Sequence, residues 1–462
     1  MKLMDIPTEL LDVILECAIV ARGIARGLRL RLVCKDFARE VMRVMYNCRL
    51  FDTLYSPPYV ERRYILPPFL QSYLEHRVKQ EPSRGNPSLN LFRRLANDLH
   101  KDMDLNDPEP LKNDECLNRL CLVAMSSSHS TKRYNKIFQA KYNPDAADYR
   151  SHLFSAALCT SNLPIVRQCV AADASLLSQF RNHDENELFG SYIVLAAEYG
   201  SLNIIRYLLM SGMSNNDTAS RADLFCHVAQ AGRLENLHYI YDFKHTELPW
   251  TFEDQESKDA EALKSAFRTK SIGVMKFVEE LRTVHSLPPI DSGTMQTDLY
   301  RCGRAGAREA AAHLLHLGAW INGPRSYEPA KVIINACAFP FADIAMIDFL
   351  LDHGANESGT IAAAALRGYT HKVVHLLDIV RLLLDAGVDV NESIGCESPL
   401  VSAISLEHTE MFRFLIERGA NLRAPRTAEE CVKRARKGGL ESMVKLLEEH
   451  GVDVNSYQEV LD

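Results

Sequence analysis

The sequence lacks the features that mark secreted and membrane-spanning proteins. Its twelve cysteines include no C-x-x-C pair, and scattered thiols favour a reducing compartment over a disulfide framework. The longest apolar run, residues 332–342, is interrupted by Asn335 and is too short to span a bilayer. Asp12 and Glu16 interrupt the apolar residues near the start, which excludes a recognisable signal peptide. These absences predict a protein of the cytoplasm, the nucleus or both, with no membrane association.

Strings typical of catalytic and nucleotide-binding sites are also missing. No P-loop, H-E-x-x-H or G-x-S-x-G string occurs. Tyr327 and Lys331 have the spacing of the Tyr-x-x-x-Lys pair of short-chain dehydrogenases, but no Gly-rich strand–turn–helix accompanies them. His313 and His316 share a helix face without further zinc ligands nearby. We therefore expect no catalytic residue, no cofactor and no metal, and an enzyme within residues 51–150 is a third, less favoured hypothesis.

What remains is an ordinary globular composition. The 462 residues are 47% hydrophobic and 24% charged, with a formal charge of −7. This length predicts two to four domains, or one domain followed by a repeat array. The acidic balance argues against nucleic-acid binding. The one basic stretch, residues 21–49, has no interleaved aromatics suited to base stacking, so a solvated helix face is favoured over phosphate contacts.

Two helical patterns open the chain, within a first domain expected at 1–50. Residues from about 6 to 20 predict an amphipathic helix whose acidic stripe is formed by Asp5, Glu9, Asp12 and Glu16. Apolar residues cover its opposite face: Ile6, Leu10, Val13, Ile14 and Cys17. A second apolar face runs through Leu30, Val33, Phe37, Val41 and Val44.

Residues 6–37 resemble an F-box on two motifs at the expected separation, "IPTELLDVIL" and "LRLVCKDF". The resemblance implies binding to a Skp-type adaptor of a cullin–RING (SCF-type) ubiquitin ligase. The contacts that it carries over are Ile6, Pro7, Leu10, Leu11, Ile14, Leu15, Val33, Cys34 and Phe37. The alternative is a purely structural cap on the segment that follows. A module this small cannot bury every apolar face internally, which favours a partner.

The next segment, residues 51–150, is interpreted as a helical connector. Helices are expected at about 69–80, 89–103 and 115–125. Polar, turn-rich stretches separate them at 81–88 and 104–114, and another follows at 126–133.

From about residue 150 the chain repeats itself. The pattern of "IVRLLLDAG" recurs in near-copies that end at Gly318, Gly354, Gly387, Gly419 and Gly451, at intervals of 36, 33, 32 and 32 residues. A sixth copy ends at Gly212, and weaker units end at Asp173, Lys244 and Arg282, which makes about nine units. The residue pattern of each unit predicts a helix, a tight loop, a second helix and a terminal glycine in the left-handed conformation. Stacked units bury the apolar faces that one unit alone cannot bury.

Residues 151–456 resemble ankyrin repeats, with a C-terminal tail at 457–462. The family's "T-P-L-H-x-A" opening is best kept as Ser398-Pro399-Leu400 with Ala403. The resemblance implies an all-α ankyrin-repeat solenoid. One unit departs from the pattern, because "KVVHLLD" and "IVRLLLD" stand side by side, which predicts one long helix over about 371–386 or a local defect.

Nearly the whole chain resembles fungal proteins that join an F-box-like head, through a helical connector, to ankyrin repeats. The resemblance implies a non-enzymatic protein-interaction adaptor, with the array recognising a target and the head joining a ubiquitin ligase. A scaffold or regulator with no ubiquitin role is the alternative. Candidate partner contacts are Trp320, in a turn where the family usually has Asp, and Trp250 and Phe252, in an irregular insert. Packing against neighbouring residues is the alternative role for these three side chains.

Overall fold

The structure is a computed structural model. It describes residues 6–32, 34–52, 67–101, 113–126, 130–138, 146–212, 218–243, 250, 258–322, 332–338, 343–355, 373–391, 398–424 and 426–460. Most of these residues are helical, which confirms the expected all-α class. A hairpin of two short strands, β1 (Glu185–Asn186) and β2 (Gly190–Ser191), is an unpredicted addition. The chain divides into two compact units, Met1–Pro289 (unit 1) and Ile290–Asp462 (unit 2).

Unit 1 begins with α1 (Thr8–Arg22), α2 (Ile24–Gly27), a 3-10 helix (Leu28–Leu32) and α3 (Lys35–Asn47). Pro7 precedes the first turn of α1, where its missing N–H leaves no hydrogen bond unmade. The apolar face expected to run from Leu30 through Val44 is broken before Lys35. The break arises because Cys34 is extended, with φ −164°, and its thiol accepts a hydrogen bond from the backbone N–H of Phe37. Val33 lies outside the described residues.

The connector contains one more helix than the sequence predicted. Its helices are α4 (Pro67–Gln80), α5 (Pro87–Lys101), α6 (Asn113–Ser126) and α7 (Ser130–Phe138). Helix α7 begins inside the polar stretch 126–133, which was wrongly interpreted as a turn. Tyr134, Ile137 and Phe138 are buried at helical spacing, whereas Asn135 and Lys136 between them are only half-buried, so α7 has an apolar face despite its polar start.

The remainder of unit 1 consists of paired helices. The first members, α8 (Ala146–Cys159), α11 (Tyr192–Tyr199), α13 (Thr218–Gln230) and α15 (Lys258–Ala266), contact one another in sequence. The second members do the same: α9 (Leu163–Ala172), α12 (Leu202–Gly212), α14 (Leu234–Asp242) and α16 (Ile272–Val284). One extra helix, α10 (Ser175–Arg181), precedes the hairpin. Two layers of helices therefore share the apolar core.

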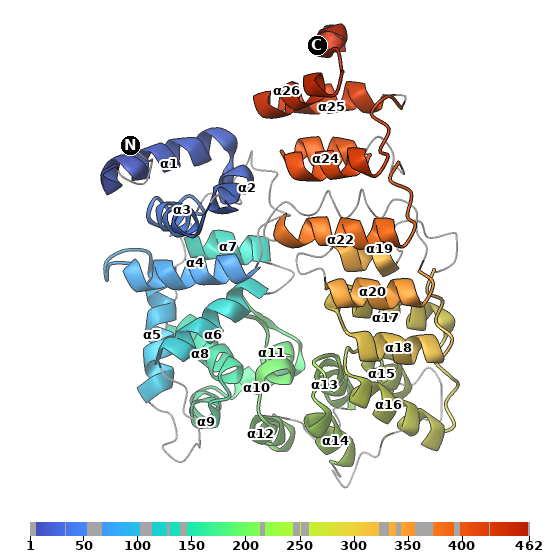
Figure 1. The fold of residues 1–462 in the computed structure, drawn as a ribbon. Coiled ribbons are helices and arrows are strands. Elements are labelled where there is room, and N and C mark those ends of the chain that lie inside the picture. Colours follow the sequence, from blue (N-terminus) through green and yellow to red (C-terminus); the bar gives the residue numbers. More distant parts are fainter. Residues whose placement is uncertain are drawn as a thin grey trace. The chain divides into compact units, whose positions relative to one another are not determined.

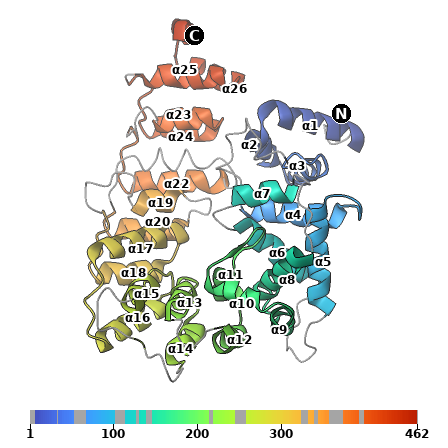
Figure 2. The same ribbon diagram turned by 180° about the vertical axis from the view of Figure 1, so that it is seen from behind.

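Unit 2 is also built from pairs of helices, and its successive pairs are stacked in a row (Figures 1 and 2). The pairs are α17 (Ser292–Ala305) with α18 (Arg308–His316), α19 (Val332–Ala338) with α20 (Ile344–Asp352), α23 (Pro399–Ser405) with α24 (Thr409–Glu417), and α25 (Thr427–Lys437) with α26 (Glu441–Glu449). Helix α22 (Val373–Asp385) has 13 residues where α18, α20, α24 and α26 have 9 each. The long helix expected over 371–386 is therefore present.

The terminal glycines of unit 2 adopt the left-handed conformation that the repeat pattern predicts. Their φ angles are +101° at Gly318, +82° at Gly354, +89° at Gly387, +91° at Gly419 and +79° at Gly451. A Cβ atom built on any of the five meets no atom within 4 Å. Glycine is required there by backbone conformation and not by a lack of space. The sixth glycine, Gly212, is the last residue of α12, in unit 1.

Asparagines connect successive turns of unit 2. The side-chain amide of Asn322 donates to the carbonyl of Gly354 at 3.0 Å, and that of Asn391 donates to the carbonyl of Gly419 at 3.3 Å. The backbone N–H of Asn421 donates to Oδ1 of Asn391 at 2.7 Å. Asn322 and Asn391 each stand four residues after their own terminal glycine, and Asn421 stands two residues after Gly419, so these bonds set the register between turns.

A buried hydrogen-bond network holds the β1–β2 hairpin against α8. Oδ1 of Asn186 accepts from the backbone N–H groups of Leu188 (3.0 Å) and Phe189 (3.2 Å), which closes the turn. The same oxygen accepts from Nδ1 of His152 at 3.0 Å, so Nδ1 carries the proton. Burial lowers the pKa of His152, because a charged imidazolium loses its hydration there.

We predict that replacing Gly419 with alanine lowers the free energy of unfolding by about 1–2 kcal/mol, the cost of a left-handed L-residue. Gly419→Asn is the matched control, and it should cost less, because asparagine tolerates this conformation. Chemical denaturation of the full chain measures both changes. Equal losses for the two variants would show that φ is not what selects glycine.

We also predict that stability falls as the pH drops below about 6.5, the pKa of an unfolded histidine. Because the folded-state pKa of His152 is lower, the unfolded chain takes up the proton first, and acid favours unfolding. The contribution is complete above pH 6.5 and is lost toward the folded-state pKa. Thermal denaturation between pH 7.5 and 5.5 should show a shallower loss for His152→Gln than for the wild type. Parallel slopes would contradict the assignment.

Candidate protein-binding surfaces

Helix α1 exposes a continuous row of apolar side chains, here called the α1 stripe. Leu10, Val13, Ile14 and Val20 are 58%, 56%, 45% and 62% exposed, and Cys17 between them is exposed as well. At 100° per residue these five positions fall on one side of the helix. An uninterrupted apolar surface of this kind marks an interaction site more often than scattered apolar residues do.

The opposite side of α1 holds it against α3. Leu11, Leu15 and Ile19 are buried on that side. Asp12 receives two hydrogen bonds from the Arg43 guanidinium of α3, one of them at 2.9 Å from Nη1 to Oδ2. Both side chains are about one-third exposed, so this ion pair is worth at most about 1 kcal/mol. Apolar burial therefore positions α1, and the ion pair fixes its rotation.

Arg43 also pairs with a carboxylate of its own helix, α3. Its Nε donates to the Glu40 carboxylate at 2.7 Å. The hydrogen bonds from Arg43 and Arg39 lower the pKa of Glu40. Arg39 and Arg43 are thus paired with carboxylates of the module itself, which supports a solvated face for this part of residues 21–49.

The structure divides the nine F-box-like residues into two groups. Pro7, Leu10, Ile14 and Cys34 are exposed, and Ile6 is half-buried. Leu11, Leu15 and Phe37 belong to the internal core of the module, and Val33 lies outside the described residues. The stripe also includes Val13, Cys17 and Val20, which the F-box motif did not select. Their helical spacing from Leu10 is the signal that identifies them.

Trp320 lies in the turn of unit 2 that follows Gly318, two residues after that glycine. It is 65% exposed, and its backbone N–H donates to Oε1 of Gln296 at 3.2 Å. Two turns carry aspartate at the same place, Asp389 and Asp453, whose carboxylates accept from the backbone N–H two residues later. The Trp320 side chain cannot accept this local hydrogen bond, because an indole has only a donor, and its ring is exposed. No contact among the described residues explains the exchange, so Trp320 is a candidate interaction anchor.

Trp250 has a structural role. Its indole N–H donates to the carbonyl of Tyr241 at 3.0 Å, and its ring packs on Tyr241 and Phe225. The Arg221 guanidinium lies 4.1 Å from the centre of the same ring. Packing, the alternative considered for this residue, accounts for its position. Phe252 lies outside the described residues.

No metal site or membrane span is found in the part of the chain that the structure describes. Three His, Cys, Asp or Glu side chains do not converge anywhere among those residues. None of the described helices combines the length and the apolar character needed to cross a bilayer.

Comparison with known proteins adds no relative. No protein-family model matches the sequence, and no curated protein matches it significantly.

The two tryptophans provide a matched test of this assignment. We predict that Trp320→Ala changes the free energy of unfolding by no more than about 0.5 kcal/mol, as at other surface sites. Trp250→Ala should cost about 2–3 kcal/mol, below the 3–5 kcal/mol typical of fully buried aromatics because Trp250 is half-buried. Urea denaturation measures both. Acrylamide should quench the Trp250→Phe protein, which keeps only Trp320, more strongly than the Trp320→Phe protein, and the reverse order would overturn the assignment.

Proposed function

We propose that the chain is a non-enzymatic adaptor. Its F-box-like module would bind a Skp-type adaptor of a cullin–RING ubiquitin ligase, and its helical array, of ankyrin type, would hold a target protein. The α1 stripe is the observation that carries this proposal. It is an exposed apolar surface on the same helix that bears the "IPTELLDVIL" motif.

Burial of the α1 stripe supplies only part of the binding free energy that such a complex needs. Complete burial of a Leu, Ile or Val side chain contributes about 1.5–3 kcal/mol. Leu10, Val13, Ile14 and Val20 are about half exposed, so covering all four contributes roughly 3–6 kcal/mol. Association costs roughly 4–15 kcal/mol in lost freedom. A stable complex therefore needs further contacts, and the exposed Pro7 and Cys34 are the F-box-like residues left to make them.

The ankyrin interpretation of the array is supported by features beyond its period. Paired helices end in left-handed glycines, and asparagines at a fixed place bridge successive turns. Ser398, in the best-kept "T-P-L-H-x-A" opening, caps α23 by accepting from the backbone N–H of Val401. Pro399 then takes a first-turn position, where its missing N–H is tolerated.

The mechanism proposed is proximity. A target held by the array would be presented to a transferase bound through the α1 stripe, so that an encounter between separate molecules becomes a reaction within one assembly. This requires two separate surfaces on one chain and no catalytic group. The alternative is a scaffold without a ubiquitin role. It is supported by Trp320, which is exposed, lies in unit 2 and is not part of the α1 stripe.

We predict that the double substitution Leu10→Glu with Ile14→Glu weakens binding of the full-length chain to a purified Skp-type adaptor at least tenfold. Two buried charges would replace apolar contacts. Met210→Glu is the matched control, because Met210 is 66% exposed on α12 and lies outside the stripe. Isothermal titration calorimetry measures both.

The control variant should bind as the wild type does, and circular dichroism should show both variants folded. If the wild type does not bind the adaptor at micromolar concentration, the ligase part of the proposal is wrong and the scaffold alternative is favoured. Normal function in cells after deletion of residues 1–50 would lead to the same conclusion.

A further inference from the structure

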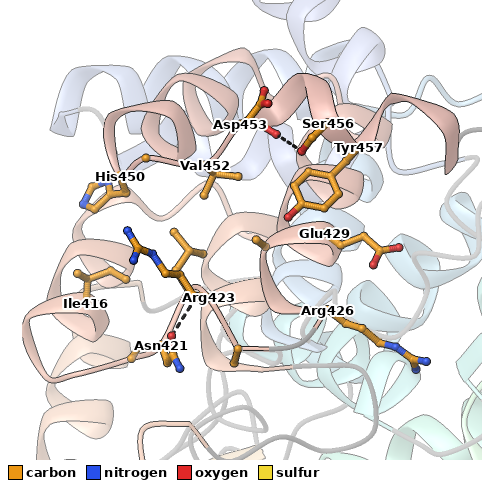
Figure 3. Close-up of a pocket in the computed structure, with 15 residues that line it drawn as sticks. Ile416, Asn421, Arg423, Arg426, Glu429, His450, Val452, Asp453, Ser456 and Tyr457 are labelled. Carbon is orange, nitrogen blue, oxygen red and sulfur yellow. Dashed lines mark hydrogen bonds between the residues drawn. The ribbon is translucent and has the colours of Figure 1, made fainter.

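An open hollow of about 630 Å³ lies in unit 2, between the turn that follows α24 and the turn that follows α26 (Figure 3). The 3-10 helix Val454–Val460 contributes Tyr457 to its wall. Ile416 and Val452 supply apolar surface, and Arg423 and His450 lie beside them. The hollow thus combines apolar surface with a cation and an imidazole.

The cations of the hollow differ from other arginines nearby. Arg418 forms an ion pair with Asp385 at 2.7 Å, and Arg413 forms one with Glu449 at 3.8 Å. Within the described residues, the side chains of Arg423 and Arg426 have no such partner. Because an unpaired guanidinium keeps its five donors available, Arg423 can receive a carboxylate in a two-point contact.

His450 is oriented by its neighbours. Its Nδ1 lies 2.8 Å from the carbonyl of Leu446, so this nitrogen carries the proton and donates it. The edge-to-face contact with Phe412, with ring centres 5.2 Å apart, holds the imidazole plane. With Nδ1 donating to Leu446, Nε2 of the neutral imidazole is the nitrogen left to accept a backbone N–H of a bound segment.

Among the described residues, neither of the two carboxylates that line the hollow forms an ion pair with Arg423. Asp453 accepts a hydrogen bond from the backbone N–H of Asn455 at 3.1 Å, as part of its own turn. The Glu429 side chain extends on the opposite side of the hollow from Arg423 and His450, as does that of Arg426 (Figure 3). Arg423 and His450 therefore lie together on one side of the hollow, and Glu429 and Arg426 lie on the other.

We propose that this hollow binds an extended acidic segment of a protein. The Arg423 guanidinium would receive an Asp or Glu carboxylate of the segment, Nε2 of His450 would accept one of its backbone N–H groups, and Ile416 and Val452 would contact an apolar side chain. A donor for a carboxylate beside an acceptor for an amide N–H selects a peptide over a free anion. This deepens the proposed function, and it rests on that function only in taking the ligand to be a protein target.

A phage library of random dodecapeptides, selected on the immobilised full-length chain, tests the proposal. Peptides with Asp or Glu at one recurring position should be enriched on the wild type. The enriched peptide, labelled with fluorescein, should bind Arg423→Glu at least tenfold more weakly by fluorescence anisotropy. Its Asp/Glu→Gln counterpart should bind the wild type at least tenfold more weakly as well.

Arg308→Glu is the matched control, since Arg308 is an exposed arginine of α18 in the same unit and outside the hollow. It makes the same change in net charge and should bind the peptide within twofold of the wild type. Absence of acidic enrichment, or equal losses for Arg308→Glu and Arg423→Glu, would overturn the proposal. Binding of the Skp-type adaptor by Arg423→Glu should be unchanged, so a failure of this site is distinguishable from a failure of the α1 stripe.

Discussion

A pair of helices in this chain is too short to bury its own apolar faces, and this constraint shapes the rest of the molecule. In unit 1 the first helices of neighbouring pairs contact one another, and the second helices do the same. In unit 2 the first helices α17 and α19 are in contact, as are α23 and α25, and α20 and α22. Stability is therefore shared between neighbours. The turns that join one pair to the next take little part in this core. They are held by a left-handed glycine and by Asn or Asp side chains that bond the backbone, so the fold places little demand on their other side chains.

Trp320 and Arg423 illustrate that freedom. Both stand in turns whose backbone is fixed by other residues, Gly318 with Asn322 in one and Gly419 with Asn421 in the other. Neither side chain is needed to close its turn. Different surfaces can therefore arise along the array without any change in the fold, as expected where a repeated scaffold carries variable loops.

Much of this architecture was predictable from the sequence, because local patterns determine it. Helices α5 and α6 begin within two residues of their expected starts, and α22 was expected as one long helix. The prediction was wrong where a side chain changes the local backbone. The Cys34 thiol caps α3, so this helix begins at Lys35 and the expected apolar face is broken there. The prediction was wrong again at Asn186, whose amide closes an unpredicted hairpin. The hollow was not predictable, because Arg423 and His450 lie 27 residues apart in the sequence and meet only through the packing of α24 and α26.

The α1 stripe is the feature that folding explains least. Val13 and Val20 are β-branched, and on an exposed helix face they stabilise the helix less than alanine, lysine or glutamate would. Leu10 and Ile14 leave about half of their apolar surface in water, where a polar side chain would cost the fold nothing. The buried residues Leu11, Leu15 and Ile19 already hold α1 in place. Apolar side chains at positions where stability does not require them mark the α1 stripe as a candidate interaction surface.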